Sequence, residues 1–162
     1  MEHLVYTDKK AKVLSRILDG TKTMIIRGAA GRKLPYGRVF KGETLYFIEN
    51  NGSGLIKAKA TVTSVFNSEK MTEEQSKLLV SENQDKLQLT NAQIKRWAGK
   101  KYLCLVEISN VEEIEPLDLD RQRNMDDWIT VEDIKSIVEN EDSPSKEYKI
   151  VKLTDDKKYL QR

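Results

Sequence analysis

Six cationic side chains gather in one acid-free segment of the chain, and this segment carries the clearest chemical signal. Between Gly20 and Gly42 there is no Asp or Glu, while glycine occurs five times. The cations are Lys22, Arg27, Arg32, Lys33, Arg38 and Lys41. Lysine supplies a point charge for phosphate, and arginine a planar fork for phosphate or a base edge. The segment therefore predicts binding of RNA or a nucleotide-like ligand, with a merely solvated loop as the alternative.

Tyr36 lies inside the same segment and fits the same kind of ligand. Readers of single-stranded RNA commonly stack bases on aromatic side chains, and a cationic groove holds the backbone beside them. We therefore include Tyr36 among the expected ligand-binding residues.

Other residue types that often carry chemistry are scarce. The chain has one histidine and one cysteine, which excludes a Cys/His zinc site and a disulfide within the chain. His3 has no partner nearby in the sequence, so we expect it at the surface or at a strand edge. Cys104 lies in an apolar run and is expected to be an inert core residue. Asp126 and Asp127 are expected to cap a helix, so we predict no metal site and no cofactor.

The composition describes one domain of 162 residues with 38% apolar and 33% charged residues. No apolar run is long enough to cross a bilayer, and the N-terminus lacks the pattern of a secretory signal. We therefore expect a cytoplasmic protein with no membrane partner. Residues 1–60 hold 12 Lys and Arg against 5 Asp and Glu, whereas residues 116–162 hold 9 against 12. The basic charge is thus concentrated in the N-terminal third.

The elements that must position these residues are mostly strands. Alternating or continuous apolar runs predict strands over residues 3–6, 23–26, 43–49, 55–66, 102–108 and 148–153. A first helix is expected after Thr7 or Asp8, ending near Gly20. Three capping boxes predict further helices, at Thr72-x-x-Gln75, Thr90-x-x-Gln93 and Thr130-x-x-Asp133. Because regular βαβ alternation is missing, we expect a mainly β, α+β fold: a small, partly open β-barrel with helices on its rim.

Residues 17–27 resemble the signature of the ASCH domain, a family of the PUA-like superfamily. An apolar helix end is followed by Gly-x-Lys-Thr at residues 20–23 and by Arg27. The strand entry at residues 41–47 and the strand at residues 58–65 are also similar. The resemblance covers about residues 4–115, so we expect a barrel domain over 1–115 and a C-terminal extension over 116–162, packed on the same domain.

The resemblance implies a PUA-like barrel whose cleft, beside the first helix, takes RNA, nucleotides or modified nucleosides. The residues that match the signature, Lys22, Thr23 and Arg27, are then expected to line this cleft. Arg32, Lys33 and Arg38 are expected to widen its positive entrance. Binding of RNA or a nucleotide-like ligand is therefore the leading functional hypothesis.

Two alternatives stand beside it. Some ASCH-type proteins resemble amidohydrolases of acylated cytidine that use a Lys, a Thr three residues later and a downstream Glu; a ribonuclease role is also associated with the family. Here Lys22 and Glu82 match, but Ile25 stands at the Thr position. A hydrolase of a modified nucleoside or of RNA, using Lys22 and Glu82, is therefore the less favoured reading. The second alternative is a protein-interaction module that works through the acidic extension 116–162.

Overall fold

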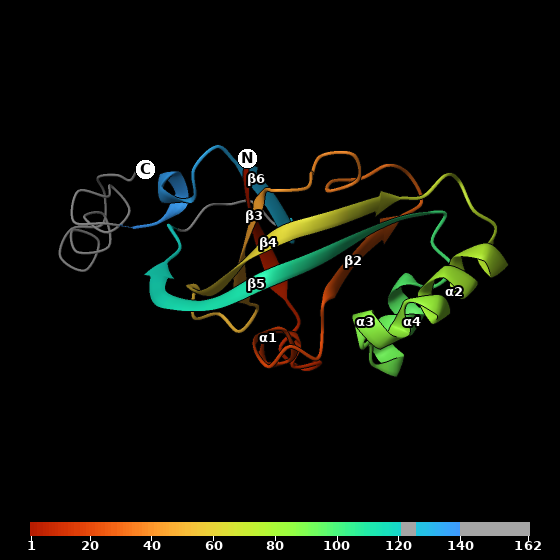
Figure 1. The fold of residues 1–162 in the computed structure, drawn as a ribbon, viewed down its shortest axis with the longest axis horizontal. Helices are drawn as coiled ribbons and strands as arrows, with labels where there is room; N and C mark the ends of the chain where they lie inside the picture. The colour runs from red at the N-terminus through yellow and green to blue at the C-terminus, as the bar shows by residue number, and fades with distance from the viewer. Residues whose placement is uncertain (121–125, 140–162) are drawn as a thin grey trace, which may run out of the picture.

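The computed structural model describes residues 1–120 and 126–139, in which a mixed six-stranded sheet forms a half-barrel (Figure 1). The strands are β1 (Glu2–Thr7), β2 (Met24–Ala29), β3 (Thr44–Glu49), β4 (Leu55–Asn67), β5 (Tyr102–Asp118) and β6 (Trp128–Val131). The helices are α1 (Val13–Leu18), α2 (Glu73–Glu82), α3 (Gln84–Leu87), α4 (Asn91–Trp97) and the 3₁₀ helix η1 (Ile134–Ile137). This agrees with the predicted mainly β fold with helices.

The order of the strands places the first strand inside the sheet. The order is β2-β5-β4-β3-β1-β6, with β1 parallel to β3 and antiparallel to β6. A parallel pair needs a crossover, and here the chain makes it through α1 and β2. Strands β2 and β6 are left at the two edges. The half-barrel therefore has an open seam, and α2, α3 and α4 gather beside β2 (Figure 1).

The buried side chains of the described residues form three clusters, and β4 contributes to two of them. Ile56, Ala58, Ala60 and Val62 are buried, while the intervening residues are half-exposed, as the period of two in a strand requires. Cys104 of β5 is 2% exposed in one of these clusters. Burial raises the pKa of its thiol to about 12, and the predicted core position of Cys104 is confirmed.

Two of the three predicted capping boxes form. The Thr72 hydroxyl accepts from the Gln75 backbone N–H, and the Gln75 side chain accepts from the Thr72 N–H. Thr90 and Gln93 make the same pair of bonds at the start of α4. The first helix differs from the prediction, because α1 begins at Val13 without a side-chain cap.

The described part of the C-terminal extension adds a strand where a helix start was predicted. Residues Trp128–Val131 form β6 on the edge of β1, so Thr130 is not a helix cap. Asp133 caps η1 instead, accepting from the Lys135 N–H. The prediction at Thr130 is wrong because pairing with β1 outweighs the local capping signal. The edge strand predicted over residues 148–153 lies outside the described residues.

His3 is fully buried in β1, which pairs with β3 on one side and β6 on the other, so the prediction of a surface or strand-edge position is wrong. Its ring nitrogens contact Glu43, Thr130 and the indole N–H of Trp128.

Across residues 1–120 and 126–139, no helix combines the length and the apolar character that crossing a membrane requires.

Candidate functional site

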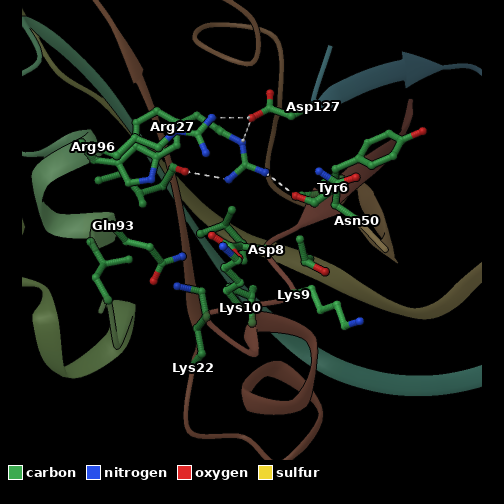
Figure 2. Close-up of a pocket in the computed structure, with 17 residues that line it drawn as sticks. Tyr6, Asp8, Lys9, Lys10, Lys22, Arg27, Asn50, Gln93, Arg96 and Asp127 are labelled. Atoms are coloured by element: carbon green, nitrogen blue, oxygen red, sulfur yellow. Dashed lines mark hydrogen bonds and ion pairs between the residues drawn. The ribbon is translucent and has the colours of Figure 1, made fainter. Parts of the chain in front are cut away.

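A cavity of about 390 Å³ lies at the open seam of the half-barrel. Its walls come from β1, the turn after β1, β2 and α4. Figure 2 shows the polar side chains that surround it. The cations among the lining residues are Lys9, Lys10, Lys22, Arg27 and Arg96, and the carboxylates are Asp8 and Asp127. The cavity is therefore lined by five cations and two carboxylates, and this excess of positive charge attracts anions.

Arg27 of β2 bridges the seam. Its Nη2 donates to the Tyr6 carbonyl of β1 at 2.7 Å, and its Nη1 donates to the Ile26 carbonyl at 2.9 Å. Its Nε lies 3.2 Å from Asp127 Oδ2 as an ion pair that lacks the alignment of a hydrogen bond (Figure 2). Arg27 thus ties together two strands that no backbone ladder joins, and it does so at the wall of the cavity.

Two indole rings hold the Arg27 guanidinium in place. Its Cζ lies 5.9 Å from the ring centre of Trp97 and 5.6 Å from that of Trp128. A guanidinium at these distances is attracted to the ring faces. Burial lowers the pKa of Arg27, while Asp127 opposes that change. Because a free arginine has a pKa above 12, the side chain stays charged.

Lys22 is a buried amine at the base of the same cavity. It follows α1, its backbone N–H donates to the Arg16 carbonyl, and its side chain is only 3% exposed. Its Nζ donates to the Leu87 carbonyl, and no carboxylate of the described residues forms an ion pair with it. Burial, followed by the positive charges of Arg27 and Arg16, lowers the pKa of Lys22 to about 7.

Helix α4 supplies the outer wall, which the sequence analysis missed. Gln93, Arg96 and Trp97 line the cavity, and their spacing of i, i+3 and i+4 places them on one face of the helix. The Arg96 guanidinium lies 4.4 Å from the ring centre of Trp97, and its side chain is 60% exposed. The helical spacing after the Thr90 capping box was the one signal in the sequence that pointed to this face.

Of the residues predicted to bind ligand, Lys22 and Arg27 line the cavity. Lys33 lines a neighbouring hollow instead. Arg32 and Arg38 are exposed and line neither. Tyr36 is half-buried, and its hydroxyl donates to the Ser68 carbonyl. The basic segment thus contributes to the cavity through its first two cations.

The remaining predicted residues lie away from the cavity lining. Thr23 begins the approach to β2, and its backbone N–H donates to the Lys86 carbonyl. Glu82 is the exposed last residue of α2. Neither lines the cavity, so the structure does not bring Glu82 to Lys22 there. Within the described residues, no three His, Cys, Asp or Glu side chains form a group that could hold a metal ion.

No family model matches the sequence, and no curated protein matches it. Among solved structures, the ASCH protein from Zymomonas mobilis is similar, with a TM-score of 0.61, 14% identity, and coverage of 85% of this chain and 96% of that one. A tyrosine-to-phenylalanine mutant of that protein gives a TM-score of 0.63 at 13% identity, covering 83% and 93%. A serine-to-alanine mutant gives 0.62 at 14% identity, covering 83% and 91%. The chain therefore has the fold of these ASCH structures, as the sequence resemblance implied.

Proposed function

We propose that this chain binds the phosphate-bearing part of a nucleotide or of single-stranded RNA in the seam cavity. The observation that carries the proposal is the pair of largely buried cations, Lys22 and Arg27, lining one cavity of about 390 Å³. Small-molecule sites have volumes of about 300–1,000 Å³, so one nucleotide fits. The fold supports the proposal as well. It agrees with the sequence resemblance to the ASCH family, and that resemblance implies RNA or nucleotide ligands.

A phosphate explains why a lysine is buried without a carboxylate. An isolated buried ammonium is costly, so Lys22 gives up its proton easily while the cavity is empty. A phosphate beside Nζ restores the charged form by Coulomb attraction, and Nζ keeps two further N–H donors for it. Lys9 and Lys10 are exposed at the rim, where they attract anions before contact.

The base is proposed to lie against α4. Arg96 covers one face of Trp97 and is 60% exposed, so a base can stack on the outer face of its guanidinium. Gln93 uses its Oε1 to accept from the Thr90 N–H, which leaves its Nε2 to donate to a base edge. The phosphate is thus assigned to Lys22 and Arg27, and the base is assigned to α4.

The direct test measures binding of nucleoside 5′-monophosphates and of a labelled ten-nucleotide single-stranded RNA at roughly 50 and 200 mM salt. Three phosphate contacts with a single strand predict about a 20-fold loss of RNA affinity over this range. Lys22→Met and Arg96→Ala are expected to weaken binding of both ligands. Lys70→Ala is the matched control, because Lys70 is exposed and lines neither hollow. No binding at 50 mM salt, or an equal loss in Lys70→Ala, contradicts the proposal.

A second candidate is hydrolysis of an acylated nucleoside, favoured by the Lys22 pKa of about 7, which suits a general base at neutral pH. The neutral amine would take a proton from water as the water oxygen bonds to the acyl carbon. The ammonium would return that proton to the leaving nitrogen as the C–N bond breaks. This reading predicts turnover that Lys22→Met abolishes and that Glu82→Ala, outside the cavity, leaves intact. Binding without turnover excludes it.

A further inference from the structure

A second hollow of about 540 Å³ is also lined by the Arg27–Asp127 ion pair. The two hollows share five lining residues: Arg27, Asn50, Arg96, Trp97 and Asp127. The two hollows therefore adjoin, and the ion pair lines both of them. Figure 2 shows Asp127 beside both Arg27 and Arg96.

The second hollow has cations of its own. Lys33, from the loop between β2 and β3, and Lys100, from the turn between α4 and β5, both line it and are both exposed. Neither forms an ion pair with a carboxylate of the described residues. Two lysines from separate loops thus line one hollow, and neither is in an ion pair with a carboxylate of the described part of the chain.

The carboxylate of this ion pair lies between two arginines. Asp127 Oδ2 lies 3.2 Å from Arg27 Nε and 3.7 Å from Arg96 Nη2. This position therefore already holds an anion from the chain itself, and a ligand anion is repelled from it. Asp126 lines the second hollow as well, so a phosphate is favoured near Lys33 and Lys100 in that hollow and near Lys22 in the first.

We infer that the second hollow is a second phosphate subsite, so that the preferred ligand is a single-stranded oligonucleotide of two or more nucleotides. Its chain crosses the Arg27–Asp127 pair, with one phosphate in each hollow. The inference rests on the proposed function, because it assigns the neighbouring nucleotide of the same ligand. The two volumes support it, since each hollow alone has the size of a site for one small ligand.

The test compares a 5′-phosphorylated dinucleotide with the matching nucleoside 5′-monophosphate. Wild type is expected to bind the dinucleotide about tenfold more tightly, as one added charge-assisted contact predicts. The slope of log affinity against log salt is expected to steepen by about 0.7 for the added phosphate. In Lys33→Ala/Lys100→Ala the dinucleotide is expected to bind no better than the monophosphate, whose own affinity stays unchanged.

The control is Lys70→Ala/Lys135→Ala, which removes the same charge from exposed positions outside both hollows. If the control loses dinucleotide affinity as strongly, general electrostatics accounts for the gain and the inference is wrong. If the monophosphate binds and the dinucleotide binds no more tightly, the second subsite is wrong while the proposed function stands. If neither ligand binds at 50 mM salt, the proposed function fails and the inference fails with it.

Discussion

The indole N–H of Trp128 donates a hydrogen bond to Nδ1 of His3 at 3.0 Å, across 125 residues of sequence. An indole nitrogen can only donate, so Nδ1 must carry a lone pair. The ring proton is then on Nε2, which donates to Glu43 Oε1 at 2.8 Å. The geometry therefore selects the neutral imidazole in the folded protein.

Because the folded protein favours the neutral form of His3, we expect it to lose stability in mild acid. Burial lowers the pKa of His3, and the bond to Glu43 opposes burial without cancelling it. The unfolded chain, with a histidine pKa of about 6.5, then takes up the proton first as the pH falls. The contribution of neutral His3 to the free energy of unfolding is complete above about pH 6.5. Below that pH it is lost, by at most about 1.4 kcal/mol per pH unit.

Urea unfolding between pH 8 and pH 5 measures this loss. His3→Gln keeps an acceptor and a donor at the site but does not titrate, so its unfolding free energy is expected to vary less over the same range. An identical pH dependence in both proteins would assign the effect to other groups.

Binding of the proposed ligand is expected to take up a proton at Lys22. In the ligand-free protein the pKa of Lys22 is about 7, and a bound phosphate raises this pKa. Affinity therefore falls as the pH rises from 7 to 9, by up to about tenfold per unit. Kd measured against pH tests this, since phosphate itself is fully ionised in the upper part of that range. Lys22→Arg should flatten the profile, and a flat wild-type profile would contradict the assignment.

The cap of α4 is expected to affect binding, whereas the matching cap of α2 is not. Thr72→Ala and Thr90→Ala each remove one capping box, at a cost of about 1 kcal/mol in unfolding free energy. Of these two helices, only α4 carries cavity-lining residues, so only Thr90→Ala should weaken binding of a nucleoside monophosphate. Equal losses of affinity in the two variants would mean that the effect is general destabilisation.

The close approach of β2 to β5 predicts a strong effect of one methyl group. A Cβ at Gly28 would lie 2.5 Å from Leu103 Cδ2 and 3.1 Å from the Tyr102 carbonyl oxygen. Gly28→Ala is therefore expected to cost about 1–3 kcal/mol in unfolding free energy. Gly31→Ala is the control, because a Cβ there has no neighbour within 4 Å among the described residues. Similar urea midpoints for the two variants would show that β2 shifts freely.

Sequence patterns predicted the features that depend on near neighbours. The alternation in β4 and the capping boxes at Thr72 and Thr90 each involve residues a few positions apart, so a short window contains the whole signal. Lys22 and Arg27 were identified for a similar reason, because they belong to one basic segment.

Features that depend on distant partners were missed or mistaken. The burial of His3 depends on Trp128 and Thr130, which reach it only through the pairing of β6 with β1. Arg96 enters the cavity because α4 packs beside β2, and no local pattern indicates that packing. Arg38 belongs to the same basic segment as Lys22 but does not line the cavity. The composition of a segment does not indicate which of its loop residues face a cavity.

The position of β1 between β3 and β6 has a consequence for protein synthesis. The ribosome makes β1 first, yet the second neighbour of β1 is complete only at Val131. Until then the nascent chain carries a strand edge of the kind that promotes aggregation. The wall of the seam cavity also lacks Asp127 until that residue has been made. A chain that terminates before β6 is therefore predicted to expose the edge of β1 and to leave both its sheet and its cavity unfinished.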